Sequence, residues 1–190
     1  MVNLTRIYTR TGDDGTTALG DMSRTTKTDP RLIAYADTNE ANAAIGVAIA
    51  AGGLAEDVSA VLTRVQNDLF DVGADLATPV VEDPKYPPLR VLQTYVDRLE
   101  ADCDHFLESL EKLRSFILPG GTAGAAYLHL ACTVVRRAER ATWAAIEVHG
   151  DSVNPLTAKY LNRLSDLLFI LARAANKERG DVLWVPGENR

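Results

Sequence analysis

The chain has 190 residues and a formal net charge of −6, from 26 acidic and 20 basic side chains. This length is enough for one domain with a substantial core. The acidic balance argues against a broad nucleic-acid footprint and against a polybasic membrane surface. The N-terminus lacks the basic and then apolar run of a signal peptide, and no apolar stretch approaches the roughly 18 residues of a membrane span. We therefore expect a soluble, cytoplasmic protein whose residues 1–190 form a single domain.

The cysteines and histidines give no sign of a metal site. Cys103 and Cys132 stand alone within helical patterns, without the C-x-x-C spacing of a zinc site or the cysteine content of a disulfide framework. We expect both to be buried free thiols. His105, His129 and His149 lack metal-ligand spacing and are expected to be structural or surface residues.

The most informative segment is polar and rich in glycine, since residues 9–17 read Thr-Arg-Thr-Gly-Asp-Asp-Gly-Thr-Thr. Gly12 and Gly15 allow backbone conformations in which successive amide N–H groups surround an anion, and the threonine hydroxyls add donors. Neither the P-loop pattern nor a dinucleotide G-x-G-x-x-G unit is present. The segment therefore predicts either an unusual phosphate-binding loop or a surface turn, of which glycine and aspartate are also typical.

Apolar periodicity predicts helices from residue 30 onward. Asp29 and Pro30 provide an N-cap and a first helical residue, and the first helix runs to a stop at Gly52-Gly53. A second helix is expected over about 56–77, where apolar residues recur every three or four positions. Four prolines between residues 79 and 88 then predict an extended connection.

Three further helices are expected, at about 89–113, at about 122–148 and from about 155 to 178. In the last of these helices, leucines recur with the spacing of a coiled-coil seam, which marks a buried face. Strand signals are nearly absent. The pattern predicts an all-α, antiparallel five-helix bundle over residues 30–178, with a leader of residues 1–29 packed across it and a tail of residues 179–190.

The fourth helix contains the charged run Arg136-Arg137-Ala138-Glu139-Arg140. Arg136, Glu139 and Arg140 share one side of the helix by the three-and-four rule, and Arg137 points about a quarter turn away. Arginine suits bidentate phosphate recognition, and a salt bridge from Glu139 would hold the guanidinium groups in place. The alternative is a solvated charged face, which is common on helices.

Asn162 and Asp166 lie one turn apart beside the leucine seam of the fifth helix. Both residue types have weak helix propensity and need partners when desolvated. They indicate either a binding site or an exposed polar face. No side chain is recognisable as an activated nucleophile with a neighbouring base.

Five separated motifs occur in one order: the leader Tyr8 to Gly15, Lys27, the block Phe116 to Gly121, the run Arg136 to Arg140 and the segment Leu161 to Asp166. Together they resemble the PduO-type ATP:cob(I)alamin adenosyltransferases, over nearly the whole chain from about Arg6 to Lys177. The resemblance implies a ferritin-like, cobalamin-adenosyltransferase-like subunit of five helices. It also implies a homotrimer that binds ATP between neighbouring subunits.

The resemblance further implies the residues of a nucleotide site, in which Mg²⁺ offsets part of the triphosphate charge. No side-chain ligand for the metal is implied, because the ATP phosphates mainly hold it. One wall of the site would consist of Thr9, Arg10, Thr11, Gly12, Thr17, Ala18 and Lys27. The other wall would consist of Arg136, Arg137, Glu139, Arg140 and Asn162.

The implied reaction joins the cobalt(I) of a corrinoid, cobalamin, to the 5′ carbon of ATP and releases triphosphate. Cobalt(I) is itself the nucleophile, so the protein need only position two substrates and stabilise the leaving group. The implied catalytic residues are Arg136 and Arg140 at the triphosphate and Phe116, which would bind the corrinoid beneath its ring and exclude the lower axial ligand. Without the resemblance, Phe116 would be assigned to core packing. The implied partners include a reductase and an adenosylcobalamin-dependent enzyme.

One position departs from the family pattern. Asn39 stands where an aspartate usually pairs across the interface with the arginine that matches Arg136. Asn39 could hydrogen-bond that guanidinium, or Asp37 or Glu40 could supply the charge. The departure also keeps open an alternative function, an ATP-binding sensor or interaction module on the same bundle without corrinoid chemistry.

Overall fold

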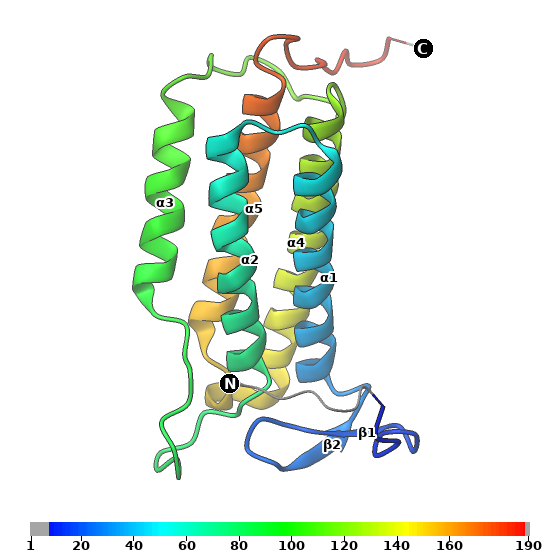
Figure 1. The fold of residues 1–190 in the computed structure, drawn as a ribbon, viewed down its shortest axis with the longest axis vertical. Helices are drawn as coiled ribbons and strands as arrows, with labels where there is room; N and C mark the ends of the chain where they lie inside the picture. The colour runs from blue at the N-terminus through cyan, green and yellow to red at the C-terminus, as the bar shows by residue number, and fades with distance from the viewer. Residues whose placement is uncertain (1–7, 189–190) are drawn as a thin grey trace.

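Five long helices run up and down in alternation and form one bundle (Figure 1). The computed structural model describes residues 8–188; the outer ends of the expected leader and tail, residues 1–7 with Arg6 and residues 189–190, lie outside the described residues. The helices are α1 (Pro30–Ala51), α2 (Glu56–Leu76), α3 (Gln93–Leu107), α4 (Ala123–His149) and α5 (Pro155–Ala175). This confirms the expected all-α five-helix bundle. None of the helices within residues 8–188 has the length and apolar character that crossing a membrane requires.

The ends of α1 follow from the residues predicted to set them. Asp29 Oδ1 accepts a hydrogen bond from the Arg31 amide at 2.8 Å, and Pro30 lies in the first turn. At the other end, the Gly52 amide donates to the Ala48 carbonyl at 2.9 Å. The limits of α2 and α4 also lie within one residue of those expected.

The core consists of the apolar faces that the helices turn toward one another. α4 packs against α1 on one side and against α5 on the other. Burying a leucine side chain stabilises the fold by about 1.5–3 kcal/mol, so the seam of α5 fixes this helix firmly in the bundle. Polar side chains beside the seam are thereby held at defined surface positions. The fully buried leucines of the predicted seam are Leu161, Leu164, Leu168 and Leu171.

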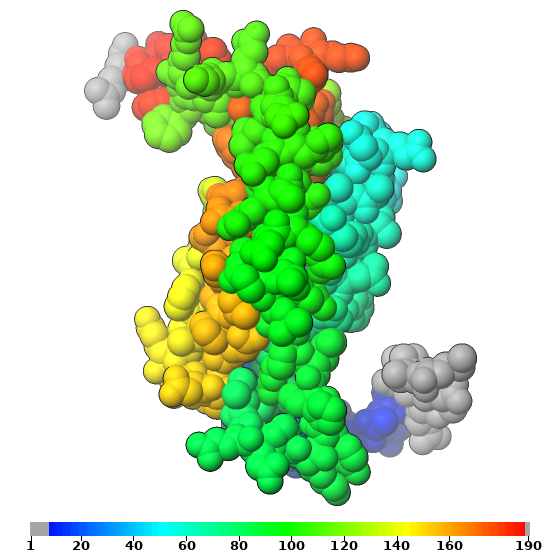
Figure 2. All heavy atoms as spheres, turned by 90° about the vertical axis from the view of Figure 1, so that its left-hand side faces the viewer, coloured from blue at the N-terminus to red at the C-terminus, as the bar shows by residue number. Residues whose placement is uncertain are grey.

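α3 is shorter than expected, because it spans Gln93–Leu107 rather than 89–113. Leu92 has an extended backbone (φ −109°, ψ 162°), which continues the path of the preceding proline segment. Beyond the helix, the Ser109 hydroxyl donates to the Phe106 carbonyl at 3.3 Å within a turn. The expected end was wrong because Leu110 continues the apolar spacing without continuing the helix. α3 runs along one face of the molecule with its outer side exposed (Figure 2).

α5 also ends early, at Ala175 rather than near residue 178. Asn176 directs its side chain to the segment before α4 instead of continuing the helix. Its Nδ2 donates to the Gly120 carbonyl at 2.9 Å, and its Oδ1 accepts from the Thr122 amide at 2.9 Å. The end of α5 is therefore bonded to the start of α4.

The leader forms a small hairpin that the sequence did not predict. Strands β1 (Thr16–Ala18) and β2 (Arg24–Thr26) pair antiparallel. The hairpin lies at the end of the bundle where α1 begins and α2 ends, so the expectation that the leader packs across the bundle is wrong (Figure 1). The Gly20 amide donates to the Ala77 carbonyl at 2.8 Å, and the Thr25 hydroxyl donates to Asp29 Oδ2 at 2.9 Å. Strands of three residues are too short to produce a readable alternation.

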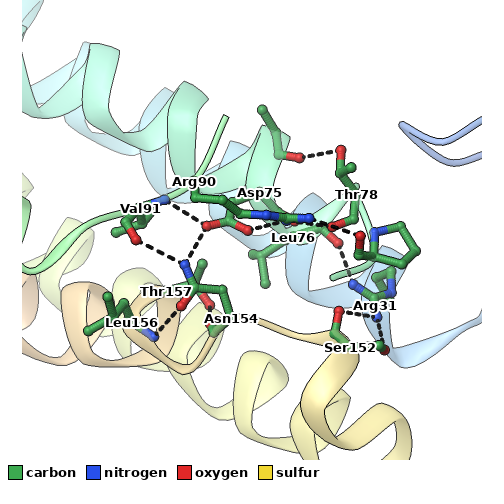
Figure 3. A network of polar contacts seen from close by, with 12 residues as sticks. Arg31, Asp75, Leu76, Thr78, Arg90, Val91, Ser152, Asn154, Leu156 and Thr157 are labelled. Atoms are coloured by element: carbon green, nitrogen blue, oxygen red, sulfur yellow. Dashed lines mark hydrogen bonds and ion pairs between the residues drawn. The ribbon is translucent and has the colours of Figure 1, made fainter. Parts of the chain in front are cut away.

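A buried polar network fixes this end of the bundle (Figure 3). The Arg31 guanidinium, only 2% exposed, donates to the Leu76 carbonyl at 3.0 Å and to the Ser152 hydroxyl at 2.7 Å. Asp75 accepts a hydrogen bond from Asn154 Nδ2 at 2.7 Å. These contacts join the start of α1, the end of α2 and the turn between α4 and α5. The base from which the hairpin extends is therefore rigid.

Candidate functional site

The loop before β1 closes on itself beside a lysine. The Gly15 amide donates to the Gly12 carbonyl at 3.3 Å, and the Lys27 amide donates to the Gly15 carbonyl at 2.9 Å. Arg10 and Gly15 have positive φ angles of 62° and 82°, so the backbone is left-handed at both positions. A Cβ atom on Gly12 would lie 3.1 Å from Lys27 Nζ and 3.0 Å from the Thr16 carbonyl oxygen. Lys27 Nζ therefore lies directly beside Gly12, and an ammonium group next to a glycine-containing polar loop suits a phosphate.

Arg24 braces this loop from β2. The hairpin register pairs Arg24 with Ala18, and its guanidinium donates to the Thr11 carbonyl at 2.9 Å and to the Thr16 hydroxyl. Asp14 accepts from the Thr16 hydroxyl at 2.7 Å and from its amide at 3.0 Å, and the hydroxyl bond is the main cause that lowers the pKa of Asp14. Sequence reasoning missed Arg24, because only the register brings it to the loop. The other residues expected on this wall are Thr9, which precedes the loop, and Thr17 and Ala18 in β1.

Two arginines of the other expected wall project from one exposed face of α4. Arg140 Nη1 donates to the Arg136 carbonyl at 3.2 Å. Arg136 Nε donates to the Ser165 hydroxyl of α5 at 3.5 Å. Neither arginine forms an ion pair within the part of the chain that the structure describes. Two such guanidinium groups on one face suit a polyanionic ligand.

The expected salt bridge from Glu139 to these arginines is wrong. Its Oε1 instead accepts from Asn162 Nδ2 of α5 at 3.1 Å and from Trp143 Nε1 at 3.3 Å. Trp143 lies one turn further along the same side of α4, and Asn162 faces it from the neighbouring helix. Glu139 therefore joins α4 to α5 rather than orienting the arginines.

Glu139 and Asn162 line a surface cleft of about 530 Å³ between α4 and α5. An indole ring, an ammonium group and an amide beside a carboxylate can hold an aromatic base by stacking and hydrogen bonding. Sequence reasoning missed Trp143 and Lys159, although their spacing from Glu139 and Asn162 places them on the same helix faces. The lining residues are Glu139, Trp143, Pro155, Leu156, Lys159 and Asn162.

Arg137 turns away from the cleft toward α1. It pairs with Asp37 at 3.7 Å and with Glu40, whose hydrogen bond is the main cause that raises the pKa of Arg137. Asp37 and Glu40, the two carboxylates considered as partners for Arg136, therefore both pair with Arg137 of the same chain. Asn39, between them, is exposed.

Phe116 lies in the segment between α3 and α4, at the end of the bundle opposite to the hairpin, and it is 75% exposed. This exposure excludes the core-packing role that residue statistics favoured. The ring makes an edge-on contact with Trp184, with 5.9 Å between the centroids. The two rings line a pocket of about 640 Å³. Its lining residues are Leu113, Arg114, Ser115, Phe116, Ile117, Phe169 and Trp184.

The thiols, His129 and His149 have structural positions, whereas His105 is exposed. Cys103 and Cys132 are buried and free, as expected, and burial raises the pKa of Cys103 to about 11. His149 Nε2 lies 2.8 Å from Asp29 Oδ1. Between residues 8 and 188, no group of three or more His, Cys, Asp or Glu side chains is arranged to hold a metal ion.

Residues 7–175 match the model of the family described as cobalamin adenosyltransferase. The chain belongs to the cobalamin adenosyltransferase family. It is 64% identical to the corrinoid adenosyltransferase of Mycobacterium tuberculosis over 189 residues, which cover 100% of this chain and 97% of the relative. It is 39% identical to the corrinoid adenosyltransferase of Bacillus subtilis, with 92% and 89% of the two chains covered.

A solved structure of a family member has the same fold. It is a phenylalanine-to-alanine variant of the PduO-type ATP:corrinoid adenosyltransferase from Lactobacillus reuteri, in complex with cobalamin and ATP. Its TM-score is 0.87 at 34% identity, and the match covers 94% of this chain and 99% of that one.

In this adenosyltransferase-family chain, the leader lies at one end of the bundle, and the segment between α3 and α4, which carries Phe116, lies at the other (Figure 1). α4, which connects the two ends, has 27 residues and is therefore about 40 Å long at 1.5 Å per residue. A single ATP molecule is far shorter than this. A nucleotide held by the leader therefore cannot reach a ligand bound at Phe116 of the same chain.

Proposed function

We propose that this protein transfers the 5′-deoxyadenosyl group of ATP to the cobalt(I) of a corrinoid, giving adenosylcobalamin and triphosphate. The observation that carries the proposal is the ammonium group of Lys27 beside Gly12 of the polar loop, in a chain of the cobalamin adenosyltransferase family. A cation beside a glycine-containing loop matches a phosphate chain.

The reaction is a displacement at the 5′ carbon. The electron pair of cobalt(I) forms the cobalt–carbon bond, the bond from the 5′ carbon to oxygen breaks, and its electrons leave with triphosphate, so cobalt(I) becomes cobalt(III). We assign Arg136 and Arg140 to the charge that develops on the leaving group. Phe116 would cover the lower face of the corrin and keep the axial base away. Because the reaction consumes cobalt(I), a reductase must supply it.

We assign the nucleotide base to the cleft between α4 and α5, where Trp143 and Asn162 lie. The triphosphate carries several negative charges, which Lys27 and the arginines offset only in part. Mg²⁺ bound to the phosphates would offset the remainder. Binding of Mg²⁺ through the phosphates agrees with the carboxylates of the described residues, which are dispersed or already paired, as Asp14 is with Thr16.

We further propose that the active form is a homotrimer with sites between subunits. The faces of α1 and α4 that carry the Arg137–Glu40 pair also expose large apolar side chains, which single chains seldom leave uncovered. The exposed apolar residues on these faces are Ile33, Val47, Leu130 and Val148.

The test is the formation of adenosylcobalamin by the purified protein from ATP and chemically reduced cobalamin, with triphosphate measured as the second product. Phe116→Ala should lower turnover and the four-coordinate cobalt(II) signal while ATP affinity stays close to that of the wild type. Tight ATP binding without any adenosylcobalamin would contradict the proposal and support the sensor alternative.

A further inference from the structure

We propose that Arg173 is a positioning residue for the site around Phe116, because its guanidinium ties the loop that carries Phe116 to the C-terminal tail that carries Trp184. This inference rests on the proposed role of Phe116 at the corrinoid. It involves Asp181 and Trp184, which lie beyond residues 7–175 that the family model matches.

The guanidinium of Arg173 bonds to two other segments from the last turn of α5. The side chain is 8% exposed, its Nε donates to Asp181 Oδ2 at 2.9 Å, and its Nη2 donates to the Glu111 carbonyl at 2.7 Å. Asp181 Oδ1 is buried without a partner among the described residues. Burying these charges carries a desolvation cost that an apolar pair would avoid, so the pair is better explained by what it positions than by stability.

Apart from Arg173, the two tied segments are joined by a short backbone pairing, by a hydrogen bond from the Ser115 hydroxyl to the Trp184 carbonyl at 3.1 Å and by the contact between the Phe116 and Trp184 rings. The Trp184 amide donates to the Phe116 carbonyl at 2.9 Å, and the Leu118 amide donates to the Val182 carbonyl at 2.7 Å. An isolated pair of short strands is marginally stable in water. Arg173 bonds to each segment a few residues before its aromatic ring, and so supplies the missing anchor.

The loop is held at both of its ends from the same turn of α5. Arg173 holds it at Glu111, and Asn176 holds it at Gly120 with a hydrogen bond of 2.9 Å. Phe116 lies between these two anchors, exposed at the edge of the 640 Å³ pocket. Loss of one anchor should therefore let the Phe116 ring move, while the nucleotide residues at the other end of the bundle stay in place.

The variant that tests the tie is Arg173→Met with Asp181→Leu in the same chain. Replacing both members of a buried ion pair leaves no uncompensated charge, so the bundle should remain folded, which thermal unfolding will verify. Arg163→Met is the matched control, because Arg163 is another ion-paired arginine of α5 but contacts Glu100 and Asp166 instead.

Two measurements report on the tie. The KM for the corrinoid should rise roughly tenfold or more and the four-coordinate cobalt(II) fraction should fall, with the KM for ATP unchanged, because only the Phe116 side is misplaced. Tryptic cleavage after the exposed Lys112 and Arg114 should also become about tenfold faster, whereas the Arg163→Met control should match the wild type in both measurements.

The outcomes separate this inference from the proposed function. A folded double variant with wild-type loop cleavage and a wild-type corrinoid KM overturns the role of Arg173. Faster cleavage with an unchanged corrinoid KM would show that Arg173 holds the loop without positioning the Phe116 site, and this outcome also overturns the proposal. If the wild-type protein makes no adenosylcobalamin, the proposed function fails, and the cleavage assay still decides whether Arg173 holds the loop.

Discussion

Arg140 is the residue whose substitution most directly tests the phosphate face of α4. Its only hydrogen bond among the described residues is to the Arg136 carbonyl one turn back, so the guanidinium is available to a ligand. Hydrogen bonds to charged groups contribute about 1.5–3 kcal/mol, so Arg140→Ala should lower kcat/KM by about tenfold or more. Arg140→Lys should recover only part of this loss, because a lysine cannot bind two phosphate oxygens in the same planar fork. Wild-type kinetics for Arg140→Ala would remove the residue from the site.

The buried His129 should make the free energy of unfolding depend on pH. His129 is 5% exposed, and its Nε2 has no partner among the described residues. Burial therefore lowers the pKa of His129 below its ordinary value of 6.5, and the charge of Asp181 opposes this shift with a smaller effect. The unfolded chain therefore binds more protons than the folded chain as the pH falls below about 6.5, and stability is lost in that window. Urea midpoints between about pH 7.5 and about pH 5.5 should fall less for His129→Leu than for the wild type.

The control for this experiment is His105→Leu, because His105 is exposed. It should leave the pH dependence of the urea midpoint as it is in the wild type. If the His129→Leu and wild-type curves are parallel, the histidine does not cause the acid sensitivity.

Single residues were predictable where their role follows from local spacing, as for Arg136 and Arg140 on one face of α4. Arg24 and Trp184 were not predictable in this way. Arg24 reaches the leader loop only through the hairpin register, and Trp184 meets Phe116 across 68 residues of chain, with a centroid distance of 5.9 Å. Glu139 was placed correctly on the helix, and Trp143 follows it by one turn, but the contact with Asn162 depends on helix packing that no spacing rule contains.

At the scale of elements, helix ends were predictable where a residue physically sets them. Asp29 caps α1 and Gly52 closes it, and both signals are local. The end of α5 depends instead on tertiary contacts, as the bonds of Asn176 to Gly120 and Thr122 show. Apolar spacing continues past the end of α3 to Leu110 and Leu113, so periodicity alone overestimates that helix.

The leader is the element for which a ligand response is expected. Its loop is exposed and is braced mainly by Arg24, so it should open readily without a nucleotide. Mg-ATP that binds the closed loop should slow tryptic cleavage after Arg10 by about tenfold or more at saturating concentration. Cleavage after Lys85, in the proline-rich connection, is the internal control and should not change. Equal protection at both sites would indicate global stabilisation rather than ordering of the leader.

At the scale of the whole molecule, the residues of the proposed site are distributed along a bundle of about 40 Å, judged from the 27 residues of α4. The hairpin lies at one end, and the segment between α3 and α4, which carries Phe116, lies at the other (Figure 1). In the proposed trimer, one subunit would contribute the leader of each site, and its neighbour would contribute the arginines of α4. Each copy alone would therefore carry two half-sites, neither of which is complete.

This arrangement predicts that two inactive variants restore activity when they assemble together. Lys27→Ala removes the cation of the leader and Arg140→Ala removes a cation of α4, so each homotrimer should lose most of its activity. A mixed trimer contains two copies of one variant and one copy of the other, so one of its three interfaces joins an intact leader to an intact α4 face, and about one third of wild-type turnover should return. The measurement is adenosylcobalamin formation by mixed trimers purified through two different tags. Separately purified variants, mixed under conditions where subunits do not exchange, are the control and should stay inactive. If the mixed trimers are no more active than the control, leader and arginines act within one chain, because assembly then creates no complete site.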